Sequence, residues 1–275
     1  MADLRSLGSD VEWPDHEAAT VVRDTLAGSP AYGRLVDLAE WVASVRTPGP
    51  DFARVRGLVL GTATPLDVAG LVDARLDEVT DLPTDVRAAF DLGVERVDAE
   101  VDSGTDLLLL AVPGLAADAC VAASVLTNTE PVKVLSRGAA ATAPETWMDL
   151  AVAVRDGRRR CMSLRDKPDD LLDALGSPRL AAAAGISMRA AARRTPLVLD
   201  GAVAAIGALI AYEAAPRAVR WWRAADQGRD PVHELVLTRL GQQPIVGLES
   251  SLGDGLTALL AVPVLRAAVR LAANP

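Results

Sequence analysis

The sequence contains few of the residues from which metal centres and disulfide frameworks are built. Its 275 residues include two cysteines, Cys120 and Cys161, and two histidines, His16 and His233. The cysteines do not have the CxxC spacing of zinc ligands, and two thiols cannot form a multi-bridge scaffold. We therefore expect no metal site, no disulfide framework and no bound cofactor.

Aromatic side chains are also scarce, and the 28 lysine and arginine residues are outnumbered by 37 acidic ones. The formal net charge is −9, whereas binding to a phosphate backbone requires a basic surface that releases counterions. We therefore expect no nucleic-acid partner. Aromatic residues make up 3% of the chain while alanine is abundant, which predicts helices that pack closely through small side chains.

No uninterrupted apolar stretch has the length of roughly 20 residues that a membrane-spanning helix needs. The two most apolar segments, Leu107–Leu126 and Leu197–Ala215, are interrupted by Asp118 and by Asp200 and Glu213 respectively. The first 15 residues carry four acidic side chains where a secretory signal needs a basic end and an apolar core. We expect a cytoplasmic protein without a membrane partner.

The hydrophobic pattern changes along the chain. Residues 15–46 have helical spacing broken at Gly28–Pro30, which predicts two helices joined by a turn. From Val55 onward, short apolar runs alternate with helical stretches, which is typical of a parallel sheet. The expected strands are Val55–Leu60, Val94–Val97, Leu107–Val112, Pro131–Leu135 and Pro196–Asp200, and the expected helices are Val68–Val79, Ala116–Leu126, Pro144–Arg160, Lys167–Leu175, Arg179–Arg194, Ala202–Ala214, Leu235–Leu240 and Thr257–Leu271.

This order of elements predicts the α/β class with a Rossmann-like three-layer αβα core and a mostly parallel sheet, over residues 50–247. Residues 1–49 and 248–275 are expected to form a small helical domain. The turn at Asp200-Gly201 leads directly from a buried strand into a helix. Ligands of open α/β sheets bind at such carboxyl ends of strands.

Several segments together resemble those of the nicotinate-nucleotide:dimethylbenzimidazole phosphoribosyltransferases, which make the lower-ligand nucleotide of cobalamin. The matching segments are Gly33–Leu35, Leu38–Trp41, Ala190–Gly201, Trp221-Trp222 through Pro231 and His233, Leu240-Gly241, Pro244-Ile245 and Leu252–Gly255. The resemblance covers most of the chain, is thin between Leu60 and Asp102, and implies that the chain is shorter than its relatives there.

The resemblance implies a general base at Asp254. In the family, a glutamate in a Gly-Glu-Gly loop takes a proton from the benzimidazole nitrogen, which then attacks the ribose of nicotinate mononucleotide. Asp254 is one methylene shorter, which withdraws the carboxylate by roughly 1.5 Å. An aspartate between Gly253 and Gly255 can equally cap the following helix, and both interpretations remain open.

The phosphate-binding run of the family, Gly-Glu-Met-Gly-Ile-Gly-Asn-Thr-Thr, corresponds to Ala111–Ala119. Here only Gly114 is kept, and an aspartate, Asp118, stands where it would repel a phosphate. The family's phosphate-neutralising lysine corresponds to Leu150, although Arg155 or the run Arg158–Arg160 could substitute for it.

The first family strand is followed by Asp-His-Gly-Val, which corresponds here to Gly61–Thr64. The absence of this motif is the fourth change at a position with a catalytic or binding role in the family, after those at Asp254, Ala111–Ala119 and Leu150. We therefore expect a divergent member of the family with eroded catalytic and phosphate-binding motifs, impaired or without catalysis. The resemblance implies substrate binding by Gly114, Asp200, Gly201, Gly253 and Gly255.

Two alternatives remain open. The chain can be an active phosphoribosyltransferase that joins nicotinate mononucleotide to an aromatic base, or a non-catalytic partner subunit or ligand sensor. The resemblance implies a homodimer, or a heterodimer with a complete family member. His233 is expected to have a structural role, His16 to be solvated, and Trp221 and Trp222 to pack within a helix.

Overall fold

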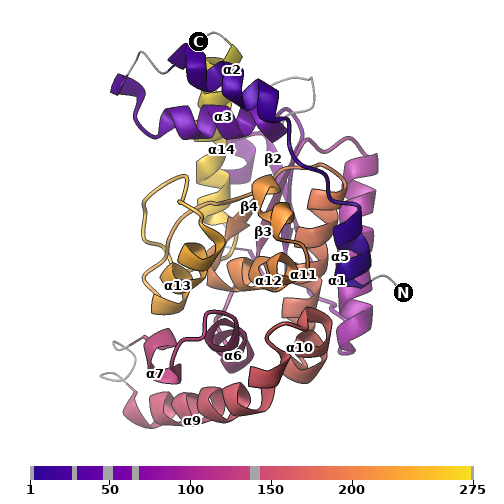
Figure 1. Cartoon of the computed structure of the whole chain (residues 1–275), viewed down its shortest axis with the longest axis vertical. Helices are drawn as coiled ribbons and strands as arrows, with labels where there is room; N and C mark the ends of the chain where they lie inside the picture. Colours follow the sequence, from indigo (N-terminus) through magenta and orange to yellow (C-terminus); the bar gives the residue numbers. More distant parts are fainter. Residues whose placement is uncertain (1–2, 27–29, 46–51, 64–67, 137–142, 274–275) are drawn as a thin grey trace.

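In the described part of the chain, five parallel strands form a sheet in the order β2-β1-β3-β4-β5. The computed structural model describes residues 3–26, 30–45, 52–63, 68–136 and 143–273. The strands are β1 (Val55–Val59), β2 (Ala74–Glu78), β3 (Leu107–Ala111), β4 (Leu197–Asp200) and β5 (Trp222–Ala224). The expected α/β class with a parallel sheet is confirmed (Figure 1).

Helices connect and cover these strands. The described α-helices are α1 (Leu4–Ser9), α2 (His16–Leu26), α3 (Leu35–Val45), α4 (Val68–Leu71), α5 (Val86–Asp102), α6 (Ala117–Leu126), α7 (Pro131–Val134), α9 (Pro144–Cys161), α10 (Pro168–Leu175), α11 (Pro178–Ala192), α12 (Gly201–Ala214), α13 (Pro231–Leu240) and α14 (Leu256–Ala273). The described 3₁₀ turns are η1 (Pro30–Tyr32), η2 (Met162–Leu164) and η3 (Pro216–Trp221).

The strand order reverses between β1 and β3. From β1 the chain first adds β2 on one side and then crosses back to add β3, β4 and β5 on the other. In open parallel sheets, such a switch point opens a crevice at the carboxyl ends of the two central strands. In this chain a ligand-binding site is therefore expected at the carboxyl edge beside β1 and β3.

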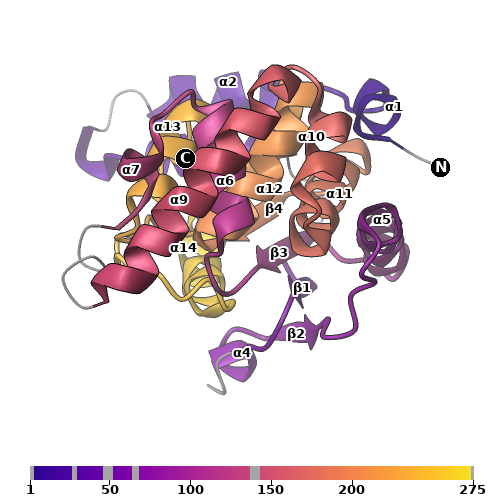
Figure 2. The same ribbon diagram turned by 90° about the horizontal axis from the view of Figure 1, so that it is seen from below.

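The sheet lies between two helical layers. Helices α11 and α12 contact β3 and β4, and α5 packs along α11. Helix α14 contacts the same two strands from the other face, which it shares with α4 (Figure 2). Right-handed crossovers place the helices in this way, because connections that run in opposite directions along the sheet emerge on opposite faces.

Helix α14 is the one described helix that is long and apolar enough to cross a membrane. The sequence-based expectation did not single it out. It packs against β3, β4 and α3 within the molecule, and the core helix of a soluble protein has the same length and composition. Its apolar character is therefore accounted for by the contacts that it makes with the sheet.

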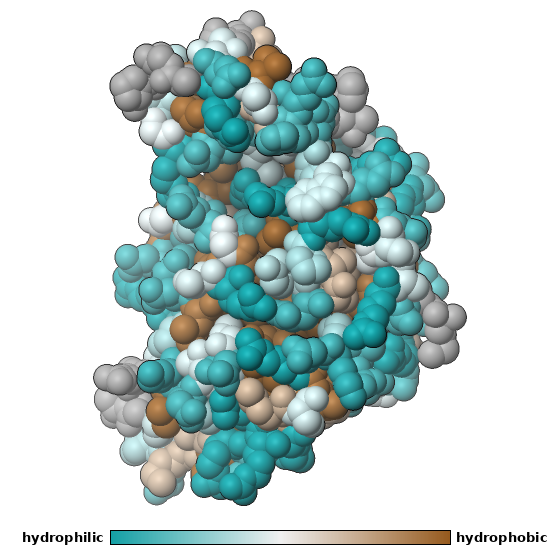
Figure 3. Space-filling view, in the orientation of Figure 1, coloured by the Kyte–Doolittle hydropathy of each residue, from teal (hydrophilic) through white to brown (hydrophobic). Residues whose placement is uncertain are grey.

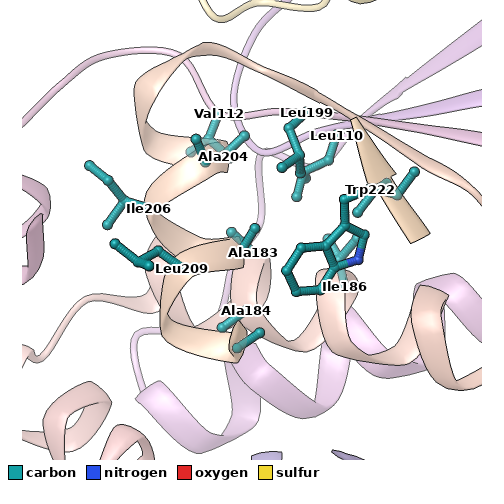
Figure 4. Packing of buried hydrophobic residues seen from close by; sticks show 14 of the residues in the cluster. Leu110, Val112, Ala183, Ala184, Ile186, Leu199, Ala204, Ile206, Leu209 and Trp222 are labelled. Carbon is teal, nitrogen blue, oxygen red and sulfur yellow. The ribbon is translucent and has the colours of Figure 1, made fainter. Parts of the chain in front are cut away.

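The face of the molecule seen in Figure 3 is mostly hydrophilic, with hydrophobic side chains in recesses between polar ones. The core beneath it is built on β3, of which every residue is buried, and on the small residues of α11 and α12. A Cβ on Gly207 would lie 2.5 Å from the Cβ of Ala183, so only glycine allows the two helices to approach this closely. The indole of Trp222 fills the space beside Ile186 and Leu199 (Figure 4).

At the top of Figure 1, α2 and α3 lie beside the end of α14, close to the C-terminus, whereas the N-terminus lies at the side of the molecule beside α1. Val22, Leu26 and Ala39 form a small hydrophobic cluster there, against which Leu271 and Ala272 pack. Helix α1, by contrast, packs against α11 and α12. The division into two domains stays a prediction.

Three of the expected elements were wrong. Residues 131–135 form the helix α7, since a proline fits the first turn of a helix and the alternating Val-Lys-Val is too short to decide the period. Residues 94–97 belong to α5, where Phe90, Gly93 and Val97 face the core at helical spacing. The expected helix over 68–79 divides into α4 and the edge strand β2.

Candidate active site

A glycine-rich loop, Gly253–Gly255, crosses the carboxyl edge of the sheet. A Cβ on Gly201, at the end of β4, would lie 2.6 Å from the Cα of Gly253, and one on Gly253 would lie 3.3 Å from the carbonyl oxygen of Val112. A Cβ on Gly255 would meet Leu76 of β2 at 3.1 Å and Val59 of β1 at 3.7 Å. The loop therefore lies across the switch point, close to the ends of β1, β3 and β4 and to the side chain of Leu76 in the middle of β2.

Two buried carboxylates hold this loop in place. Asp200, at the end of β4, accepts hydrogen bonds from Thr257 Oγ1 (2.5 Å) and from the backbone N–H of Ala258 (3.0 Å). Asp226, after the end of β5, accepts from the backbone N–H groups of Leu248 and Ser250, both at 2.8 Å. Both carboxylates thus connect a strand end to the segment that carries Asp254.

The environment of Asp200 opposes its ionisation. Burial raises the pKa of this carboxyl, the two hydrogen bonds from Thr257 and Ala258 oppose the rise, and the negative charge of Asp254 adds to it. Because both oxygens of Asp200 already accept hydrogen bonds within the protein, we assign it a positioning role.

We predict that Asp200→Asn becomes more stable relative to wild type as pH rises. The folded state holds the Asp200 proton more tightly than the unfolded state does, so the wild-type free energy of unfolding falls as pH rises above the unfolded pKa of about 3.9. Asparagine does not titrate; its Oδ1 can accept the hydrogen bond from Ala258, and its Nδ2 can donate to the Thr257 hydroxyl, which reverses the direction of that bond. Urea unfolding from pH 4 to 7 should show the stability of the variant rising relative to wild type. A relative loss with rising pH would contradict this assignment.

The carboxylate of Asp254 differs from that of Asp200. Its residue is 6% exposed, and Oδ1 accepts a hydrogen bond from the backbone N–H of Leu256 at 3.2 Å. Among the described residues, none donates a hydrogen bond to Oδ2. One oxygen is therefore held by the start of α14, as the capping interpretation expects, while the other is available to take a proton.

The loop after β3 carries Gly114 in a left-handed conformation, with φ of 81°. Arg179, in the first turn of α11, donates a hydrogen bond from Nη1 to the carbonyl oxygen of Pro113 at 2.7 Å. The same nitrogen would lie 3.6 Å from a Cβ on Gly114. This loop therefore has a guanidinium beside it, although the sequence offered no lysine at the expected position.

Sequence reasoning missed Arg179 because it compared motif positions only. The signal was topological: α11 leads into the amino end of β4, so its first turn must lie at the carboxyl edge. Asp226 was missed for a similar reason, since only the position of β5 shows that it stands at a strand end.

The arginines proposed as substitutes for the lysine lie elsewhere. Arg155 pairs with its neighbour Asp156, and Arg158 donates to Asn128, just beyond the C-terminal end of α6. Gly114 lies before the N-terminal end of that ten-residue helix, roughly 15 Å away. Leu150 packs against the core.

Gly61 also lies at this edge, where a Cβ on it would be 2.9 Å from Pro113. Of the segment that corresponds to the family's Asp-His-Gly-Val, Thr64 lies outside the described residues. Asp118 is in the first turn of α6, as the comparison of motifs expected.

The surroundings of the other candidate residues indicate structural roles. His233 is buried, and its Nδ1 accepts a hydrogen bond from the N–H of Gly228; burial lowers its pKa to about 4. Burial likewise raises the pKa of Cys120 to about 12, so its thiol is not an activated nucleophile. Trp221 ends η3 and Trp222 begins β5, which corrects the expected helix, but both indoles are buried and packed as predicted.

Comparison with known proteins gives one consistent result. A family model described as "Phosphoribosyltransferase" matches residues 82–274. The chain is 35% identical to the nicotinate-nucleotide–dimethylbenzimidazole phosphoribosyltransferase of Mycobacterium marinum over 92% of this chain and 88% of that protein. For the protein of the same name from Mycobacterium tuberculosis, the identity is 34% over 92% of this chain and 87% of that protein.

Both alignments extend over 316 positions, more than the 275 residues of this chain, so these relatives have internal segments that it lacks. The crystal structure of CobT from Thermus thermophilus superimposes with a TM-score of 0.77 at 22% identity, over 94% of this chain and 96% of that one. This likeness confirms the fold.

Proposed function

The chain belongs to the nicotinate-nucleotide:dimethylbenzimidazole phosphoribosyltransferase family, and on that basis we propose that it transfers phosphoribose from nicotinate mononucleotide to a benzimidazole-like base in the cytoplasm. The reaction takes place at the carboxyl edge of the sheet, with Asp254 as general base. The observation that carries this proposal is the free Oδ2 of a carboxylate whose Oδ1 is fixed by Leu256.

The proposed step exchanges one C–N bond for another. The ring nitrogen of the aromatic base attacks the ribose carbon of nicotinate mononucleotide as the bond from that carbon to nicotinate breaks. The N–H proton of the attacking ring passes to Asp254, and nicotinate leaves with the electron pair of the broken bond. A positioned base of this kind contributes about 10²- to 10⁴-fold to a rate.

The phosphate of the substrate is held at the loop after β3 in this proposal. Gly114 lets the substrate approach the backbone, and Arg179 supplies the positive charge. Gly201, Gly253 and Gly255 contribute by leaving room at the strand ends, and Asp200 by fixing the start of α14. None of these roles needs a cofactor.

We predict that Arg179→Gln weakens binding of nicotinate mononucleotide. A hydrogen bond to a charged group contributes about 1.5–3 kcal/mol, so the KM for this substrate should rise by roughly tenfold to a hundredfold while kcat changes less. Steady-state kinetics measures both. Arg155→Gln is the matched control, because the one ion pair of the exposed Arg155 within the described residues is with its neighbour Asp156. Equal effects of the two substitutions would contradict the assignment of Arg179.

A second candidate function is that of a non-catalytic subunit or ligand sensor. The loop at Ala111–Ala119 favours it, because this loop has none of the hydroxyl groups of the family motif and places Asp118 in the first turn of α6. Such a chain would form a heterodimer with a complete family member, whereas the enzyme would form a homodimer.

Titration calorimetry with nicotinate mononucleotide and then dimethylbenzimidazole, followed by assay of each sample for the ribotide, separates the two candidates. Binding followed by product supports the enzyme. Binding without product supports the sensor. A stable complex with a co-expressed complete relative, in the absence of activity of the isolated chain, supports the partner subunit.

A further inference from the structure

A second concave site lies at the opposite, amino edge of the sheet. Its open cavity of about 640 Å³ is lined by the start of α3, the turn η3, the first residues of β5 and the end of α13. The turn η3 leads into β5, and α13 returns from the carboxyl edge to end here. This amino-edge cavity is thus separated by the length of the strands from Asp254.

Positive charge is concentrated in the amino-edge cavity, although the chain as a whole has a net charge of −9. One carboxylate, that of Asp37, is among the groups that line it. The cationic groups that line it are Arg34, Arg217, Arg220, Arg223 and Arg239.

Most of this charge is not neutralised by acidic side chains. Arg34 and Arg217 donate to backbone carbonyl oxygens, and Arg239 pairs with Glu213 at 2.8 Å. Within the described part of the chain, Arg220 and Arg223 have no carboxylate at ion-pair distance. The guanidinium groups of Arg220 and Arg223 therefore line this cavity with no ion-pair partner among the described residues.

Arg223 is the more confined of the two. Its guanidinium lies 4.9 Å from the ring centroid of Trp41 and donates to the carbonyl oxygen of Trp222 at 3.1 Å. Burial and the charge of Arg220 lower its pKa to about 10, against the opposing charge of Asp37. The group stays protonated at neutral pH, so it is a desolvated cation that an anion would stabilise.

An aromatic surface accompanies the charge. Trp13 lines the amino-edge cavity and is 66% exposed, an unusual exposure for so large an apolar ring. A neighbouring cavity of about 650 Å³ shares Trp13, Asp37, Arg220 and Arg223, so the indole stands between two recesses. A volume of this size holds a nucleotide-sized molecule.

We propose that the amino-edge cavity is a binding site for a nucleoside phosphate, whose phosphate is held by Arg220 and Arg223 and whose base stacks on Trp13. Guanidinium groups bind phosphate through paired, charge-assisted hydrogen bonds, and an exposed indole provides the stacking face. The site does not depend on the transfer reaction at the carboxyl edge.

Titration calorimetry of the full chain with adenosine 5′-monophosphate tests this proposal, with adenosine and inorganic pyrophosphate as further probes. Arg220→Gln should weaken binding of the nucleotide at least tenfold, and Trp13→Ala several-fold. Both side chains are exposed, so the fold should persist, which thermal unfolding would check. Arg229→Gln, at an exposed arginine paired with Glu249, is the matched control and should bind like wild type.

The variant Arg179→Gln shows whether the nucleotide binds at the carboxyl edge instead, because Arg179 lies there. The proposal predicts that this variant binds adenosine 5′-monophosphate like wild type and that adenosine binds more weakly than the nucleotide. Absence of binding by wild type at millimolar nucleotide would overturn the proposal. So would unchanged affinity in Arg220→Gln, or a loss of binding in Arg179→Gln alone.

Discussion

Asp254→Asn is expected to lower the rate of phosphoribosyl transfer by about 10²- to 10⁴-fold while binding of nicotinate mononucleotide persists. The asparagine oxygen can still accept the hydrogen bond from Leu256, so the start of α14 should stay in place. What the variant loses is the oxygen that takes the proton. Measuring kcat together with the dissociation constant of the nucleotide separates these two effects.

Asp254→Glu is the matched variant for the same position. It restores the length of the family's glutamate and advances the carboxylate by roughly 1.5 Å. Since a misplacement of about 1 Å can cost on the order of a hundredfold in rate, we expect transfer by this variant to be faster than by wild type. Retained activity in Asp254→Asn would assign Asp254 to capping alone.

Gly201→Ala is expected to destabilise the protein by about 3 kcal/mol, because it adds two penalties. The residue has φ of 84°, where a Cβ is strained, and that Cβ would lie 2.6 Å from the Cα of Gly253. The unfolding midpoint should fall by about 6–12 °C. Transfer activity should fall too, since the loop with Asp254 must move.

Gly176→Ala is the control for Gly201→Ala. Gly176 also has a positive φ, 61°, but a Cβ there would have no atom within 4 Å. Gly176→Ala should lower the free energy of unfolding by about 1 kcal/mol, which is the strain of a left-handed residue alone. Thermal unfolding of both variants gives the comparison, and equal losses would show that the close approach of Gly201 to Gly253 carries no energy.

The sequence predicts the buried part of the fold well. The continuous apolar runs Leu107–Ala111 and Leu197–Leu199 lie beside turn residues, and they form the inner strands β3 and β4. The edge strand β2 was missed because its sequence, Ala-Arg-Leu-Asp-Glu, is half exposed and has no β-branched residue. Short valine pairs at 94–97 and 131–135 were mistaken for strands, since four or five residues do not define a period.

The candidate site is predictable only in part for a different reason. Motif resemblance selected Asp200, Gly201 and Gly253–Gly255, which the fold brings together at one edge, and their roles in binding stay a prediction. It did not find Arg179 or Asp226, because their positions follow from where α11 begins and where β5 ends. It also could not separate the satisfied carboxylate of Asp200 from the half-free one of Asp254, a distinction that depends on hydrogen bonds.

A turnover assay of the purified chain with nicotinate mononucleotide and dimethylbenzimidazole, in which nicotinate and ribotide are quantified together, shows whether the chain transfers phosphoribose. We expect equal amounts of both products from wild type and their loss in Asp254→Asn. Bound nucleotide without any ribotide, in wild type and in Asp254→Glu alike, would contradict this expectation.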